Sequence, residues 1–179
     1  MRITISGTPG SGKSTAARTL ARQLGYARVN GGDIYRAEAK RRGMTVNEFG
    51  AWLKEHPEWD EQLDAQLMHE GAARDNVILE GRLTGLMTKR DGIAALRVWM
   101  SASQDTRIGR LASRDGGTSE EVRKRLRERE ESERERYLRT YGLDLSDMSA
   151  YDLVVETDAR SPDEIVSLII AAMQQHGAS

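Results

Sequence analysis

What this sequence lacks narrows the range of possible functions. There is no cysteine among its 179 residues, which excludes a disulfide framework and a thiolate metal site. The net charge is −1 and the pI is near 6.3, so there is no general electrostatic reason to expect nucleic-acid or anionic-membrane binding. No apolar run approaches ~20 residues, and the chain begins with a strand pattern in place of a signal peptide. We therefore expect a soluble, cytoplasmic monomer.

Side chains for other chemistries are also scarce. No arrangement of Ser, His and Asp indicates a covalent nucleophile, and the three histidines have no metal-ligand spacing. We expect no metal site made from His56, His69 and His176. We expect the tryptophans to pack in the core or in a helical insert and not to stack on a base: Trp52, Trp59 and Trp99.

Five short apolar segments are each followed by a helical pattern. These segments are residues 2–6, a short one ending at Val29-Asn30, and residues 76–80, 96–100 and 152–156. Short strands that are apolar on both faces are typical of a parallel sheet covered by helices. The alternation predicts a doubly wound α/β fold with a five-stranded parallel sheet.

Two polar helical stretches interrupt this alternation. We expect one domain whose core comprises residues 1–32, 76–114 and 143–179, with helical inserts at 33–75 and 115–142. Capping boxes predict helix starts at Thr45-Val46-Asn47-Glu48, Thr118-Ser119-Glu120-Glu121 and Ser161-Pro162-Asp163-Glu164. Two apolar stripes should face the sheet: Ala17, Leu20, Ala21 and Leu24 in the first helix, and Ile165, Leu168, Ile169 and Met173 in the last.

The loop after the first strand carries the most specific motif. It fits G-x-x-x-x-G-K-[ST] in full, and its residues are Gly7, Thr8, Pro9, Gly10, Ser11, Gly12, Lys13, Ser14 and Thr15. Its glycines let backbone N–H groups surround phosphate oxygens at the start of the next helix. Lys13 can reach the β/γ-phosphates, and the Ser14 hydroxyl can ligate Mg²⁺. The loop predicts a nucleoside triphosphate site. Suitably placed D-x-x-G and N-K-x-D motifs are missing, which argues against a GTPase.

Charged residues follow the second and third strands. Glu80 ends the third strand beside the expected phosphate loop, where a carboxylate would hold Mg²⁺ directly or through water, and Arg82 would point across the same crevice. Asp33 and Arg36 follow the second strand, and Arg36 could bind a second phosphate group. The same segment is equally compatible with an alternative in which it is only a turn into a helix and Arg36 lies on the exposed face of that helix.

The second insert is dense in Arg and Glu. Arg129, Glu133 and Arg136 have i, i+4, i+7 spacing and therefore share one helix face. Arg110 and Arg114 are also one turn apart, on the helix that leads into the insert. Such cations can stabilise the charge of a transferring phosphoryl group. For most of the Arg and Glu residues here, a solvated helix face is the alternative interpretation.

Together these segments resemble the nucleoside monophosphate kinases, and most closely the archaeal-type cytidylate kinases. The resemblance rests on Met1-Arg2-Ile3-Thr4-Ile5-Ser6-Gly7, Gly32-Asp33-Ile34-Tyr35-Arg36, Leu79-Glu80-Gly81-Arg82-Leu83, Arg129-Glu130-Glu131-Ser132-Glu133-Arg134 and Tyr151-Asp152-Leu153-Val154-Val155. It covers nearly the whole chain and implies a P-loop NTPase-type fold. Most adenylate kinases have Asp and then Gly-Phe-Pro-Arg after the third strand, whereas this chain has Glu80-Gly81-Arg82-Leu83. This departure favours cytidylate over adenylate as the acceptor.

The resemblance also implies roles for the inserts and the charged residues. Residues 33–75 would bind the monophosphate, and residues 115–142 would form a lid. The acceptor would be bound by Asp33, Arg36, Arg82, Glu133 and Arg136. The transferring phosphoryl group would be approached by Lys13, Arg82, Arg110, Arg114 and Arg129, with Arg125 as a rival for Arg129. Thr157-Asp158-Ala159-Arg160 would lie near the donor adenine.

The expected reaction is transfer of the γ-phosphoryl group of Mg·ATP to CMP, and also to dCMP, giving ADP and CDP or dCDP. The nearest alternative is the same transfer to AMP or UMP. A more distant one is an ATP-gated module that binds RNA or a protein through the Arg/Glu-rich helix. The interleaved glutamates argue against RNA, because surfaces that follow a phosphate backbone are usually net positive.

Overall fold

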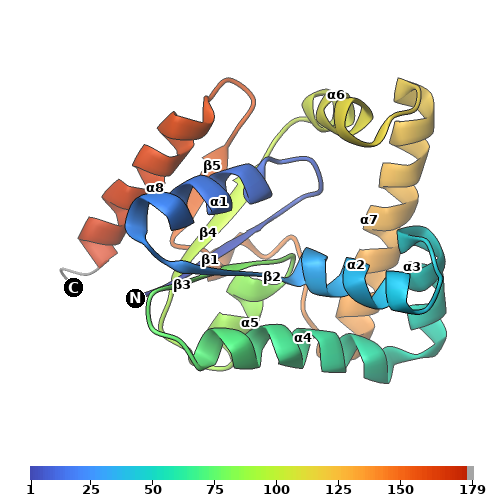
Figure 1. Ribbon diagram of the computed structural model, residues 1–179, viewed down its shortest axis with the longest axis horizontal. Coiled ribbons are helices and arrows are strands. Elements are labelled where there is room, and N and C mark those ends of the chain that lie inside the picture. Colours follow the sequence, from blue (N-terminus) through green and yellow to red (C-terminus); the bar gives the residue numbers. More distant parts are fainter. Residues whose placement is uncertain (177–179) are drawn as a thin grey trace.

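A five-stranded, all-parallel sheet forms the centre of the computed structural model, which describes residues 1–176. Its order is β2-β3-β1-β4-β5, from the strands β1 (Arg2–Gly7), β2 (Ala27–Asn30), β3 (Val77–Glu80), β4 (Leu96–Ser101) and β5 (Leu153–Glu156). The strand order reverses beside β1, so the doubly wound α/β fold predicted from the sequence is confirmed (Figure 1). Every strand ends at one edge of the sheet, and the loop after β1 lies there.

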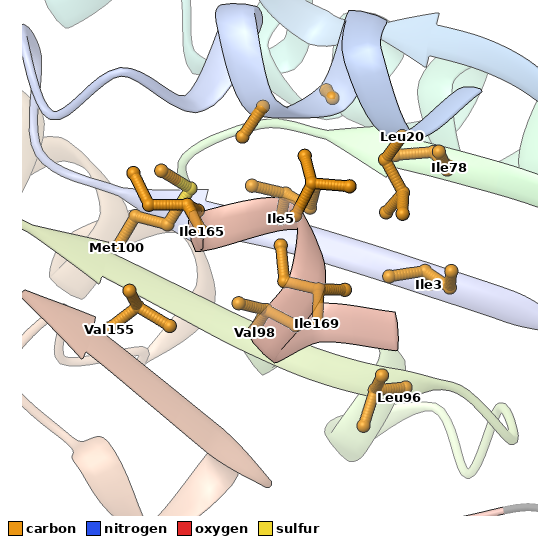
Figure 2. Packing of buried hydrophobic residues seen from close by; sticks show 13 residues of the cluster. Ile3, Ile5, Leu20, Ile78, Leu96, Val98, Met100, Val155, Ile165 and Ile169 are labelled. Atoms are coloured by element: carbon orange, nitrogen blue, oxygen red, sulfur yellow. The ribbon is translucent and has the colours of Figure 1, made fainter. Parts of the chain in front are cut away.

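Helices cover both faces of the sheet. Helices α1 (Lys13–Leu24) and α8 (Pro162–His176) lie on one face, and α5 (Thr84–Arg90) lies on the other, followed later in the chain by the 3-10 turn η1 (Met148–Ala150) (Figure 1). Figure 2 shows the main core, where Ile3, Ile5 and Val98 of the sheet meet Leu20 of α1 and Ile169 of α8. All five side chains are fully buried, and burial of this kind stabilises a fold by roughly 1.5–3 kcal/mol per large side chain.

The first insert consists of α2 (Gly31–Arg41), α3 (Val46–Glu55) and α4 (Pro57–Ala72). The guanidinium of Arg42 contacts the rings of both Trp52 and Trp59, 4.2 and 4.0 Å from their centroids. These cation–π contacts and the packing of both rings against Phe49 and Leu53 confirm that the two tryptophans pack within the insert. Trp99 is buried against Tyr151 in the core, also as predicted.

The second insert is the end of α6 (Gln104–Asp115) and the long helix α7 (Ser119–Tyr141). The first turns of α7 pack on α6 through Val122 and Leu126, whereas its last turns contact the first insert. Arg139 donates a hydrogen bond to the Lys54 carbonyl (2.9 Å). Helix α7 therefore connects the second insert to α3 and α4 of the first (Figure 1).

The local predictions are largely confirmed, with small corrections. All three capping boxes form. The strands β3 and β5 begin one residue later than predicted, and Asn76 takes a left-handed turn (φ 57°) just before β3. In α8 the predicted stripe is wrong at Leu168, which is 40% exposed, whereas Val166 is buried. At about 100° per residue Val166 and Leu168 lie equally far, on opposite sides, from the direction midway between Ile165 and Ile169, so spacing alone does not decide which of the two faces the sheet.

Candidate active site

The phosphate loop connects β1 to the N-terminus of α1. A Cβ on Gly7 would lie 2.0 Å from the Met100 carbonyl oxygen, and Gly12 caps the helix with φ 90°, so both positions require glycine. Gly10 packs against the Arg107 backbone, where a Cβ would be only 3.0 Å away. The loop therefore curves tightly and leaves the first N–H groups of α1 facing the cleft, an arrangement that favours anions.

Lys13 lies inside this loop. Its Nζ donates hydrogen bonds to the carbonyl oxygens of Gly7 (2.8 Å) and Thr8 (2.7 Å). Burial, and next the positive charge of Arg82, lower the pKa of Lys13 to about 7, while the negative charge of Glu80 opposes them. The ammonium is thus held close to other cations at the point where the loop would receive phosphate oxygens.

Glu80 ends β3 directly beside the loop and is 3% exposed. Its Oε1 accepts a hydrogen bond from the Ser14 hydroxyl, and its Oε2 accepts two from Arg28, from Nη2 at 2.6 Å and from Nε at 2.9 Å. The predicted metal-binding pair, Ser14 and Glu80, is therefore brought together, and Arg28 is an additional partner that sequence reasoning missed. A charged residue inside a short strand of a buried sheet was the available signal for Arg28.

The Ser14 hydroxyl and the Glu80 carboxylate are oxygen donors of the kind that Mg²⁺ prefers. This ion is usually bound by one or two protein oxygens, several waters and substrate phosphates. Across residues 1–176 no cluster of three or more acidic or histidine side chains is placed to hold a metal alone. The donors therefore fit a metal that arrives with a phosphate ligand, not one enclosed by the protein.

Arg82, Glu133 and Arg129 form a second ionic cluster facing Lys13. Glu133 is 6% exposed; its Oε2 accepts hydrogen bonds from Arg82, with Nε at 2.6 Å, and its Oε1 accepts one from Arg129 Nε at 2.8 Å. Burial alone would raise the pKa of Glu133, but the attraction and hydrogen bonds of the two arginines outweigh it and lower the pKa to about 2. Arg82 also donates to the Gly7 carbonyl (2.8 Å), so it ties α7 to the phosphate loop.

Two more of the residues predicted to bind the acceptor, Arg136 and Arg36, lie outside this ionic cluster. Arg136 Nε lies 2.6 Å from Oδ2 of buried Asp60, whereas Arg36 is exposed and pairs with Asp33 (2.6 Å). Arg136 thus faces the same cleft as Arg129 and Glu133, as their spacing predicts.

The arginines of α6 and the start of α7 have distinct partners. Arg110 donates to the Thr157 hydroxyl (2.9 Å) and carbonyl (2.8 Å), which places it beside the loop predicted to lie near the donor base. Arg114 is exposed and pairs with its neighbour Asp115 (2.6 Å), while Arg125 donates to the Gly116 carbonyl (3.0 Å). Of the rivals Arg125 and Arg129, only Arg129 lies in the cluster around Lys13 in this conformation.

A single large cleft contains these groups. Its volume is about 1150 Å³, and its walls come from the phosphate loop, both inserts and the carboxyl edge of the sheet. Pockets for one small ligand are typically about 300–1,000 Å³, so this cleft is large enough for two substrates. Besides the anion-binding loop, residues of α4 and α7 form part of its wall.

Comparison with known proteins places this geometry in a family. Residues 2–159 match the sequence model of the cytidylate kinase-like family. The chain belongs to that family. A protein named cytidylate kinase from Pyrococcus furiosus is 43% identical over 171 residues, covering 96% of this chain and 87% of that protein. One of the same name from Halobacterium salinarum is 39% identical over 178 residues, covering 99% and 92%.

Solved structures support the fold independently. A shikimate kinase from Acinetobacter baumannii in complex with shikimate superposes with a TM-score of 0.63, at 15% identity, covering 97% of this chain and 93% of that one. A gluconokinase from Sinorhizobium meliloti gives a TM-score of 0.59 at 19% identity, covering 97% and 91%. At these identities the likeness concerns the P-loop kinase fold alone. None of the described helices is both long and apolar enough to cross a membrane.

Proposed function

We propose that this protein transfers the γ-phosphoryl group of Mg·ATP to CMP, and also to dCMP, giving ADP and CDP or dCDP. The observation that carries the proposal is family membership over nearly the whole chain, with relatives named cytidylate kinases that align over most of their own length. The cleft supports it, because it combines one phosphate loop with a second, separately built wall for an acceptor.

The reaction requires positioning more than proton transfer. A phosphate oxygen of the monophosphate attacks the γ-phosphorus, the bond from that phosphorus to the β,γ-bridging oxygen breaks, and ADP leaves with the electron pair. The attacking oxygen is already anionic, so no general base is needed. Catalysis then consists of holding the two substrates in line and stabilising the charge of the transferring group.

Each charged group has a proposed part in that task. The loop N–H groups and Lys13 hold the donor phosphates, while Arg82 and Arg129 neutralise the group in transfer. Ser14 and Glu80 would hold Mg²⁺, which supplies further charge neutralisation on the donor phosphates. Arg36 and Arg136 hold the acceptor. Arg110, supported by Thr157, borders the donor side. Arg114 is proposed to turn from Asp115 toward the phosphates once both substrates are bound.

The test is nucleoside diphosphate formation from Mg·ATP with CMP, dCMP, UMP, AMP and GMP offered separately. We expect fast turnover with CMP and dCMP. Preference for AMP or UMP would keep the phosphoryl transfer but overturn the acceptor. No turnover with any acceptor would overturn the kinase and favour an ATP-gated binding module, whose RNA binding should then weaken steeply with salt. Sedimentation of the same sample would check the expected monomer.

A further inference from the structure

Two carboxylates on α4 face the cleft away from the phosphate loop. Asp60 and Asp64 lie one helical turn apart and both line the cleft wall. Asp60 is 3% exposed, and its Oδ2 lies 2.6 Å from the Nε of Arg136. The Oδ2 of Asp64 accepts a hydrogen bond from the Tyr141 hydroxyl (2.8 Å). Helix α7 supplies both contacts.

These carboxylates are short of hydrogen-bond donors. The buried Oδ2 of Asp60 forms an ion pair with Arg136 but accepts no hydrogen bond. Among the described residues, nothing donates to the Oδ1 of Asp64, whose only hydrogen bond is the one from Tyr141. Burial raises the pKa of Asp60 to about 7 and that of Asp64 to about 6. The pair has unused acceptor capacity toward the cleft.

The surroundings of the pair suit a flat ring. The cleft is also lined by apolar side chains, among them Leu63 and Leu67 of α4, on the helix that carries the pair, and Met87 of α5. Leu67 and Met87 are buried, and Leu63 is partly buried. A ring between these side chains would present its polar edge to the acidic pair. That combination of apolar walls and carboxylate acceptors calls for a planar ligand with an N–H donor on its edge.

We propose that Asp64, assisted by Asp60, selects an aminopyrimidine as the acceptor base by accepting a hydrogen bond from its exocyclic amino group. This inference rests on the proposed function. Cytosine presents an amino donor at position 4, whereas a 4-oxo pyrimidine such as uracil presents an acceptor there. A carbonyl oxygen and an ionised carboxylate are both hydrogen-bond acceptors, so neither can donate a hydrogen bond to the other. Sites built in this way discriminate strongly, because the wrong ligand leaves buried polar groups unpaired.

The deciding experiment measures kcat/KM for CMP and UMP in Asp64→Asn. Asn has nearly the same shape, and its carbonyl can still accept the Tyr141 hydrogen bond, while its amide can donate to a 4-oxo group. We expect kcat/KM to fall about 10- to 100-fold for CMP and to rise for UMP, so the CMP/UMP ratio falls by about 100-fold or more. The matched control is Glu61→Gln on the exposed face of α4. It removes the same charge and should leave the ratio unchanged.

Two results would overturn the inference. One is an equal loss for CMP and UMP in Asp64→Asn, which indicates a structural role only. The other is an unchanged ratio. Both presuppose that the wild-type protein phosphorylates CMP. If it does not, the proposed function fails, and this is seen before any variant is made.

A second measurement needs no variant and covers the case in which Asp64→Asn does not fold. Protonation turns the Asp64 carboxyl into a donor that can satisfy a 4-oxo group, so the wild-type CMP/UMP ratio should fall as the pH drops from about 8 to about 5.5. Tyr141 and Arg136 of α7, Arg90 of α5 and Asp60 of α4 face this carboxyl, and of these only Asp60 titrates in the same range. Both acceptors share the same phosphate, whose titration cancels in the ratio. A ratio that is flat with pH would contradict the proposal.

Discussion

Glu133→Gln is the substitution that best tests the electrostatics of the cleft. In the wild type Glu133 lies between Arg82 and Arg129, and its negative charge also offsets that of nearby Lys13. Gln keeps the size of the side chain and can accept one hydrogen bond, but it removes the charge. Three cations would then share a confined site without their central anion.

The burial of these side chains determines how much Glu133→Gln lowers the free energy of unfolding. Removing one partner of a fully buried pair costs about 3–5 kcal/mol. Glu133 and Arg82 are nearly buried, with side chains 8% and 12% exposed, but the Arg129 side chain is 37% exposed and partly screened by water. We therefore expect a loss of about 2–3 kcal/mol in the free energy of unfolding. For a chain of this length that corresponds to a fall in Tm of roughly 4–12 °C.

The pH dependence of this effect has a definite sign. The pKa of Glu133 is lowered to about 2 in the folded protein, whereas that of an unfolded Glu is about 4.3. Stability from a depressed carboxyl pKa is present above the unfolded value and is lost as the pH falls through the folded value. The Tm difference between wild type and Glu133→Gln should therefore be full at neutral pH and should shrink progressively below about pH 4.

Thermal denaturation with and without inorganic phosphate provides the assay. An anion entering the variant meets uncompensated cations, so phosphate should raise the Tm of Glu133→Gln more than that of wild type. Glu135→Gln is the control: it lies two residues away, and its exposed pair with Lys54 should contribute about 0–1 kcal/mol. A Glu133→Gln variant that matches Glu135→Gln in Tm and in its response to phosphate would refute the reasoning.

Four further predictions concern single positions. Lys13→Met should lower kcat/KM by about 10²–10³-fold without lowering Tm, because the buried ammonium assists the reaction and not the fold; near-normal turnover would contradict its role. Glu80→Gln should raise the Mg²⁺ concentration needed for half-maximal activity by about tenfold or more, as a metal titration would show. Gly71→Ala should destabilise, since its Cβ would lie 2.4 Å from Leu79 and overpacking costs about 1–3 kcal/mol, more than the gain in helix propensity. Gly109→Ala, whose Cβ would meet no described atom within 4 Å, should instead stabilise α6 by up to about 1 kcal/mol in denaturant titrations.

Local patterns were sufficient to predict most of the fold. The phosphate loop fixes a strand, a turn and a helix start within nine residues, and the capping boxes fix three more helix starts. Side chains i, i+4 and i+7 apart share a helix face whatever surrounds them, so the shared face of Arg129, Glu133 and Arg136 followed from spacing, whereas its orientation toward the cleft comes from the tertiary structure. These features depend on interactions within a few residues, which a sequence displays directly.

The partners across the cleft could not be predicted in the same way. Arg28 pairs with Glu80 across 52 positions of the chain, and Asp60 meets Arg136 from a different insert. In the sequence Asp60 has the same appearance as the exposed acidic residues around it on an Arg/Glu-rich chain, because nothing local distinguishes a buried carboxylate from a solvated one. Its burial arises only when α7 crosses α4, a tertiary contact that no periodicity encodes. The residues proposed to determine acceptor specificity are therefore those whose placement depends most on tertiary structure. The phosphate loop, by contrast, can be predicted from the sequence, and any nucleoside triphosphate can occupy it.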